Sequence, residues 1–147
     1  MTTISPTMSH RQAEHQDSNP VPAPSPMRVA IIGAGRGGMA LLDALHQIRT
    51  IQIVGISDQH PSAPGLNRAQ ELKVPVYREI ADLITHQELN LVIDATGDPA
   101  MESALRKAVP TGTDVVNGQT SRLLWLLVQH EATLQTELLH AEKLAGI

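Results

Sequence analysis

The sequence predicts an α/β protein with a doubly wound parallel sheet of about five strands. Three observations support this prediction. Short runs of β-branched residues recur along the chain, each run is followed by residues spaced as in an amphipathic helix, and a cluster of glycines joins the first run to the first helix. Alternating strands and helices form a parallel sheet with right-handed crossovers. We expect the strand order 3-2-1-4-5 and a long C-terminal helix.

The glycine cluster follows the first predicted strand, residues 27–32, and opens the first helix. Gly33, Gly35 and Gly38 have the spacing G-x-G-x-x-G, and Asp58 follows the second predicted strand, Ile51–Ser57. Glycines at this spacing, followed about twenty residues later by an acidic residue, form the dinucleotide fingerprint of Rossmann folds. Free N–H groups and the helix dipole at the helix start favour a pyrophosphate. We therefore predict a Rossmann-like dinucleotide site, with a purely structural turn as the alternative.

The acidic residue also indicates which dinucleotide binds. Asp58 is expected to accept hydrogen bonds from the adenosine ribose and to repel a 2′-phosphate, which favours NAD(H) over NADP(H). A strand-end cap is the alternative role for Asp58. Arg36 leaves the cofactor open, because a solvated loop arginine and a phosphate partner fit it equally. The predicted cofactor-binding residues of the turn are Gly33, Ala34, Gly35, Arg36, Gly37 and Gly38.

The remaining elements alternate regularly after a proline-broken loop that leads into a short helix. The third strand contains a proline, which an edge strand tolerates because a missing N–H costs no ladder hydrogen bond there. The later strands are short apolar runs, and residues at helical spacing separate them. The expected strands are 74–77, 91–94 and 114–116, and the expected helices include 80–86 and 99–108.

The turn after the fourth strand is predicted to belong to the site. Ala95, Thr96 and Gly97 lie beyond the carboxyl end of a central strand, where ligands bind in open α/β sheets. We expect these three residues to contact the cofactor. Asp98 is followed by Pro99, which predicts a helix capped by the aspartate with proline in its first turn.

The last helix is predicted to begin at Thr120 or Ser121 as cap and to run to the C-terminus. It begins apolar and becomes mixed after His130. A nearly seven-residue repeat then indicates a coiled-coil stalk or a dimer helix, so we expect a homodimer through this helix. The residues of the repeat are Leu127, Leu134, Leu138, Ala141 and Ala145.

Composition bounds the class of protein. The chain has 147 residues, a formal net charge of −4 and no cysteine, which excludes disulfides, thiol catalysis and cysteine-ligated zinc. Its three lysines are scattered, which argues against binding to nucleic acid or to an anionic membrane surface. No apolar run approaches the roughly twenty residues that span a bilayer. We expect a cytoplasmic protein.

Three segments are predicted. Residues 1–26 are rich in polar residues and prolines and are expected to be disordered. His10 and His15 are interpreted as tail residues rather than metal ligands, and no metal site is predicted. Residues 27–119 form the nucleotide-binding domain and 120–147 the C-terminal helix. About 120 residues support one core but no separate substrate domain.

Residues 27–118 resemble the N-terminal nucleotide-binding half of the glucose–fructose oxidoreductase and inositol dehydrogenase family. The segments VAIIGAGRGG, IVGISD and LVIDATGDP carry this resemblance, which implies a Rossmann fold that binds NAD(P). Enzymes of the family carry Glu-Lys-Pro after the fifth strand, where the lysine serves hydride transfer. This chain has Asn117-Gly118-Gln119 there and no lysine between Lys107 and Lys143. We therefore predict no catalytic residue and no catalysis by this chain alone.

A second resemblance suggests what replaces catalysis. The segments GAGRGGMALLDAL, 95–99 and 120–125 look like Rossmann domains at the front of bacterial signalling proteins, including sensor histidine kinases. The tail 141–147 is similar to the segment that precedes the dimerisation and phosphoacceptor helices of those kinases. The resemblance implies an NAD(H)-binding sensory module that forms the input of a signalling protein, with a histidine kinase or another signalling protein as partner.

Two alternatives remain beside the sensory module. The chain is also consistent with the nucleotide-binding half of an NAD(P)-dependent oxidoreductase that lacks its substrate domain and works with another chain. A third interpretation is an interaction domain without a nucleotide, whose helix pairs two copies. A catalytic lysine after the fifth strand would favour the oxidoreductase, and the sequence has none there.

Overall fold

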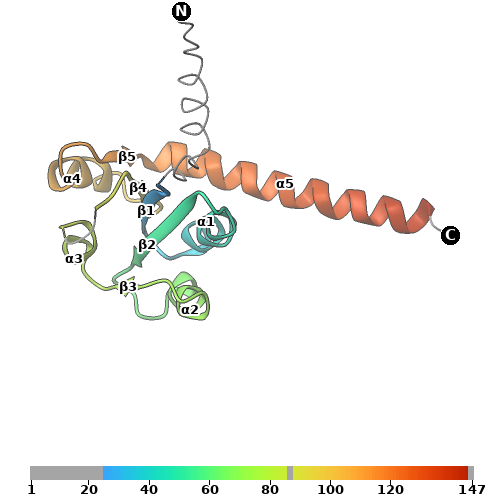
Figure 1. Cartoon of the computed structure of the whole chain (residues 1–147), viewed down its shortest axis with the longest axis horizontal. Coiled ribbons are helices and arrows are strands. Elements are labelled where there is room, and N and C mark those ends of the chain that lie inside the picture. Colours follow the sequence, from blue (N-terminus) through green and yellow to red (C-terminus); the bar gives the residue numbers. More distant parts are fainter. Residues whose placement is uncertain (1–24, 86–87, 146–147) are drawn as a thin grey trace, which may run out of the picture.

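The computed structural model describes residues 25–85 and 88–145. Five parallel strands form one sheet in the order β3-β2-β1-β4-β5, as the sequence predicts (Figure 1). The segment 1–26, with His10 and His15, lies outside the described residues apart from its last two. The strands are β1 (Met27–Ile32), β2 (Ile51–Ser57), β3 (Val76–Tyr77), β4 (Leu91–Asp94) and β5 (Asp114–Val116).

The strand register brings the functional loops to one edge of the sheet. Ile32, the last residue of β1, pairs with Ser57 at the end of β2 and with Asp94 at the end of β4. The three strands therefore end at the same level, and the turns that follow them lie side by side. The edge strand β3 pairs only with the end of β2 and leaves Pro75 outside the strand.

Helices cover both faces of the sheet (Figure 1). Val29 and Ile31 of β1 belong to the core shared with α1, α2 and the start of α5, whereas Ala30 and Ile32 belong to the core shared with α3 and α4. Apolar side chains on both faces explain why the strand sequence is continuously apolar. The helices are α1 (Arg36–His46), α2 (Pro64–Glu71), α3 (Ile80–Thr85), α4 (Met101–Ala108) and α5 (Gly118–Ala145).

Helix α4 begins at Met101, two residues later than predicted. The Asp98 carboxylate accepts a hydrogen bond from the Ala100 N–H at 2.9 Å, and the Met101 N–H donates to the Asp98 carbonyl at 3.1 Å. Asp98 thus closes a turn in front of the helix, and residues 99–100 belong to that turn. The predicted aspartate contact exists, but the helix bound was wrong.

Helix α5 begins at Gly118, so the prediction of Thr120 or Ser121 as its cap was wrong. The Thr120 N–H donates to the Asn117 side-chain oxygen at 2.9 Å, and the Ser121 N–H donates to the Asn117 carbonyl at 2.9 Å. Asn117 therefore caps the helix, because its side chain reaches the free N–H of the first turn. Ser121 lies inside that turn and is buried.

Helix α5 is 28 residues long and extends well beyond the sheet (Figure 1). Its start packs on the core through Leu124, whereas Leu127, Leu134 and Leu138 are at least half exposed. The projecting part thus presents leucines that the described residues do not cover. Among the residues that the structure describes, no helix has the length and hydropathy needed to cross a membrane.

Candidate functional site

Two glycines of the turn after β1 are required by the fold. Gly33 has a φ of +103°, and a Cβ there would lie 2.7 Å from the backbone of Ala95. A Cβ on Gly38 would lie 1.9 Å from the Gly33 carbonyl oxygen. A side chain at either position would push the first turn of α1 away from the strands. These glycines therefore set the close approach of strand and helix.

Gly35 and Gly37, unlike Gly33 and Gly38, have open space where a side chain would begin. A Cβ on either residue would meet no heavy atom of the described structure within 4 Å, and neither has a positive φ. Packing within the chain therefore does not require glycine at these positions. Gly35 caps α1 without a side-chain hydrogen bond, and the N–H groups of a first helical turn have no partner inside the helix. An open backbone surface at a helix start fits an anionic group.

The turn is held in place by three hydrogen bonds to the backbone of Gly33 and Ala34. The Gly33 N–H donates to the Ser57 carbonyl at 2.8 Å, and the Gly65 N–H of α2 donates to the Ala34 carbonyl at 2.7 Å. The Ala34 N–H donates to the Asp58 carboxylate at 2.8 Å. The turn is thus fixed by contacts from α2 and from the end of β2 and the loop that follows it.

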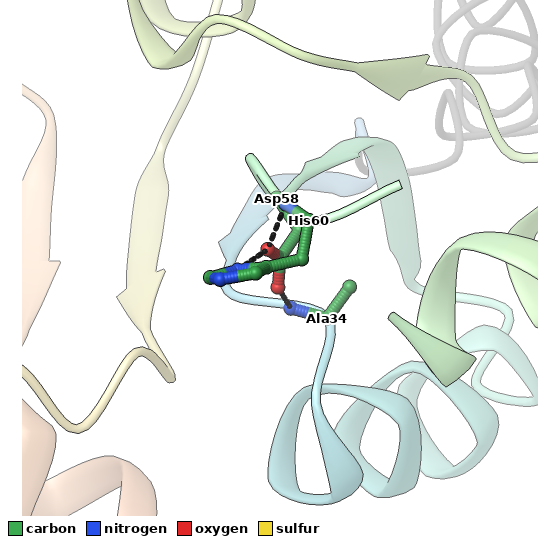
Figure 2. A network of polar contacts seen from close by, with 3 residues as sticks. All are labelled: Ala34, Asp58 and His60. Carbon is green, nitrogen blue, oxygen red and sulfur yellow. Dashed lines mark hydrogen bonds and ion pairs between the residues drawn. The ribbon is translucent and has the colours of Figure 1, made fainter. Parts of the chain in front are cut away.

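Asp58 anchors the turn through hydrogen bonds from the backbones of Ala34 and His60 (Figure 2). Its Oδ2 accepts from Ala34, and its Oδ1 accepts from the His60 N–H at 2.9 Å and lies 3.2 Å from His60 Nδ1. Burial raises the pKa of the Asp58 carboxyl, but the hydrogen bonds from the backbones of His60 and Ala34 and from the His60 ring outweigh burial. The pKa is therefore below its ordinary value of 3.8.

The carboxylate of Asp58 keeps capacity for a further partner. Each carboxylate oxygen can accept two hydrogen bonds, and the Asp58 side chain is 15% exposed. The strand-end contact that the sequence left as an alternative is present, since Asp58 binds the backbone of its own loop and of the glycine turn. It does not exhaust the acceptor capacity of the carboxylate.

A pocket of about 420 Å³ lies between the glycine turn, the loop after β2 and the turn after β4. It brings together five of the predicted site residues. Sequence reasoning missed Gln59 and His60, although they directly follow Asp58, and it missed Ile80 and Met101, which only the fold brings here. The lining residues are Ile32, Gly33, Gly35, Ser57, Asp58, Gln59, His60, Ile80, Ala95, Thr96, Asp98 and Met101.

Besides Gly38, which packs against the Gly33 carbonyl, four predicted residues do not line this pocket. Arg36 is exposed and lines the groove between α1 and α5 rather than this pocket. Gly37 and Gly97 line a second cavity, of about 230 Å³, on the side of β4 that faces α1 and α5. Ala34 is buried in the turn and takes part through its backbone. The turn thus lies between two hollows, one that contains Asp58 and one that faces α1 and α5.

The end of β4 is fixed by a buried carboxylate that the sequence did not single out. Asp94 is 2% exposed, and its Oδ1 accepts from the Thr96 N–H at 3.0 Å and from the Thr96 hydroxyl at 2.7 Å. The Thr96 hydroxyl in turn accepts from the Asp98 N–H at 3.1 Å. These contacts hold the turn that carries Gly97, whose φ is +73°.

The strand order, the glycine turn and the pocket across the sheet edge define a Rossmann-like nucleotide-binding domain. Residues 27–123 match the family model described as dihydrodipicolinate reductase, N-terminus, and the chain belongs to this family. The match agrees with the Rossmann nucleotide-binding domain that the sequence motifs indicated. No curated protein sequence matches the chain significantly.

Several solved structures share the fold. Myo-inositol 2-dehydrogenase from Lactobacillus plantarum is 26% identical with a TM-score of 0.54, and the match covers 62% of this chain and 27% of that one. Myo-inositol dehydrogenase from Lactobacillus casei, in complex with NAD(H) and myo-inositol, is 22% identical with a TM-score of 0.53, covering 61% and 27%. GenD2 from gentamicin A biosynthesis, in complex with NAD, is 17% identical with a TM-score of 0.55, covering 74% and 32%.

The matched region thus spans less than a third of each of these three proteins. The two structures below 25% identity establish the likeness of fold alone. The inositol dehydrogenases that the sequence motifs indicated are present among the structural matches. These matches do not bear on the resemblance to signalling proteins.

Proposed function

We propose that this chain binds NAD(H) at the carboxyl edge of its sheet and acts as a regulatory input module of a signalling protein. The observation that carries the binding proposal is the open space at Gly35 and Gly37, where the chain's own packing does not require glycine. This space adjoins the pocket that contains Asp58. Two of the solved structures that share the fold are complexes with NAD(H) or NAD, which supports the same ligand class.

Different residues of the site would bind different parts of the cofactor. The N–H groups at the start of α1 would bind the pyrophosphate, and Asp58 would accept hydrogen bonds from the adenosine ribose hydroxyls. The Asp58 charge, with its lowered pKa, disfavours a 2′-phosphate. Ala95 and Thr96 line the pocket that contains Asp58, and Gly97 lines the second cavity. In oxidoreductases NAD(H) supplies hydride transfer.

The position of α5 supports a regulatory role. The helix starts at the sheet edge, and Gly118, Ser121 and Trp125 line the second cavity beside Gly37 and Gly97. The same helix then projects from the domain (Figure 1). A ligand at this edge can therefore change how the helix docks, provided that its affinity differs between two helix arrangements.

The projecting helix also supports pairing of two chains. The exposed Leu127, Leu134 and Leu138 follow the spacing of a coiled-coil seam. We propose a homodimer through α5, which would transmit a change in docking to a histidine kinase or another signalling partner. Burying these leucines against a second copy removes apolar surface from water.

The second candidate function is the nucleotide-binding half of an oxidoreductase whose substrate domain lies on another polypeptide. The family match and the dehydrogenases among the structural matches favour it. It predicts NADH oxidation or NAD⁺ reduction when this chain is mixed with that polypeptide and its substrate. The regulatory proposal predicts instead a change in helix pairing upon binding, without turnover.

Thermal unfolding with NAD⁺, NADH, NADP⁺ and NADPH tests the binding proposal. A ligand at about one hundred times its dissociation constant adds about 2.7 kcal/mol of stability, so NAD⁺ or NADH should raise the melting temperature more than the phosphorylated forms. The absence of a shift with all four would contradict the proposal.

A matched pair of variants locates the ligand. Gly35→Val places a side chain in the open space but has a permitted backbone, with φ of −72° and ψ of −162°. It should fold and lose the ligand-induced shift. Ala104→Val, on the exposed face of α4, should keep it. A retained shift in Gly35→Val would place the ligand elsewhere.

A further inference from the structure

His60 lines the pocket that contains Asp58, and its ring lies beside the Asp58 carboxylate (Figure 2). The backbone of His60 is fixed, because its N–H donates to Asp58 Oδ1 at 2.9 Å and its carbonyl accepts from the Ala63 N–H at 3.0 Å. The side chain is 86% exposed, and within the described part of the chain Asp58 is the hydrogen-bond partner of the ring. The ring can therefore turn away while the loop keeps its shape.

The hydrogen bonds within the chain take up most of the acceptor capacity of Asp58. A carboxylate offers about four acceptor positions, two on each oxygen. Oδ2 accepts from the Ala34 N–H at 2.8 Å. Oδ1 accepts from the His60 N–H and lies 3.2 Å from His60 Nδ1, and because a carboxylate only accepts, the ring nitrogen must donate in this contact. The position that remains is on Oδ2.

The adenosine ribose needs more than this one position. Its adjacent 2′ and 3′ hydroxyls would both donate to the acidic residue after β2, so one of the existing contacts must be given up. The N–H groups of Ala34 and His60 belong to backbone that other hydrogen bonds hold in place. The ring contact is the longest of the three and the most exposed to water. It is therefore the contact that a ribose can replace.

We propose that the His60 ring is an autoinhibitory contact, which NAD(H) must displace from Asp58 before both ribose hydroxyls can bind. This inference rests on the proposed function. An exposed contact of this kind contributes little free energy, so displacing it weakens binding by about two- to fivefold. A ligand with a single hydroxyl on this ribose uses the free position on Oδ2 and leaves the ring in place. His60 thus sets the affinity for a ribose that carries both hydroxyls.

A double-mutant cycle between protein and ligand tests the displacement. ADP and 2′-deoxy-ADP share the adenine and the diphosphate and differ in the 2′ hydroxyl. In titration calorimetry, His60→Ala should bind ADP and NAD⁺ about two- to fivefold more tightly than the wild type does, and it should bind 2′-deoxy-ADP with wild-type affinity. An equal gain for ADP and 2′-deoxy-ADP, or weaker binding of ADP, would overturn the inference.

A second variant separates the hydrogen bond from the bulk of the ring. His60→Phe keeps an aromatic ring that cannot donate, so it should gain affinity for ADP as His60→Ala does. A gain in His60→Ala alone would mean that the ring acts by its size, which contradicts the inference. His46→Ala is the matched control and should bind each ligand as the wild type does. His46 is exposed in the last turn of α1 and lines a separate cavity with Pro26 and Ile51.

NMR of the ¹⁵N-labelled His60 ring observes the displacement directly. Saturating NAD⁺ should shift the Nδ1 signal as the hydrogen bond to Asp58 is lost, whereas 2′-deoxy-ADP should leave it unchanged. If NAD⁺ binds while the Nδ1 signal and the affinity of His60→Ala stay as in the wild type without ligand, this inference is wrong and the proposed function stands. If the wild-type chain does not bind NAD⁺, both fail.

Discussion

The Ala34 N–H donates a hydrogen bond to Asp58 Oδ2 at 2.8 Å across 24 residues of the chain (Figure 2). This contact ties the glycine turn after β1 to the acidic residue that follows β2. A residue proposed to bind the ribose therefore also holds the turn proposed to bind the pyrophosphate. Stability and ligand binding are coupled through this one carboxylate.

Asp58→Asn should therefore affect both properties. The amide presents only one acceptor atom to donors on both sides, so the free energy of unfolding should fall by about 1–3 kcal/mol. Loss of the charge should also narrow the preference for NAD⁺ over NADP⁺. Urea unfolding and calorimetry measure the two effects. Asp82→Asn, on the exposed side of α3, is the control. Equal stability of Asp58→Asn and the wild type would contradict the structural role proposed for Asp58.

The lowered pKa of Asp58 predicts how this difference depends on pH. A carboxyl whose pKa is lower in the folded than in the unfolded chain stabilises the fold above its ordinary value of 3.8, and the contribution is lost as the pH falls through the folded pKa. The stability gap between wild type and Asp58→Asn should be constant above about pH 5 and shrink below it. Urea midpoints across this range measure the gap. A gap that persists undiminished in strong acid would contradict the assigned contacts.

The two kinds of glycine in the turn should respond differently to alanine. Gly38→Ala places a Cβ 1.9 Å from the Gly33 carbonyl, and such overpacking costs about 1–3 kcal/mol or more. Gly35→Ala meets no atom and should unfold near the wild-type temperature while weakening NAD⁺. Thermal unfolding with and without ligand compares them. Equal destabilisation of both variants would mean that Gly35 is glycine for structural reasons.

The exposed leucines of α5 should hold two chains together. Leu134→Lys and Leu138→Lys place charges in the proposed seam and should convert a dimer to a monomer in sedimentation velocity. Thr136→Lys, on the other side of the heptad, keeps the added charge away from the seam and should leave the mass of the dimer. A wild-type chain that sediments as a monomer at micromolar concentrations would exclude pairing through α5 alone.

The sequence predicts the sheet well because apolar runs that are mostly buried mark β1, β2 and β4 directly. The helix starts are less predictable, since Asn117, Thr120 and Ser121 are all good caps and only the completed turn after β5 shows that Asn117 fills this role. Side-chain direction is not encoded locally either. Arg36 stands in the glycine motif but points toward the α1–α5 groove.

Part of the candidate site is also beyond a local pattern. Asp94 is the last residue of an apolar strand, and its burial follows from α5 covering the end of β4. His60 could have been expected from its place two residues after Asp58. Membership of the dihydrodipicolinate reductase family could not be predicted from these residues, because the glycine turn and the acidic residue after β2 occur in many Rossmann folds.

Amide NMR of the labelled chain, titrated with NAD⁺, tests whether a dinucleotide binds at the glycine turn. We expect saturable shifts at the amides of residues 35–38, of Asp58 and of Thr96, with smaller changes along the start of α5. Unchanged amide signals at these positions, or shifts confined to another surface, would contradict a dinucleotide site at the glycine turn.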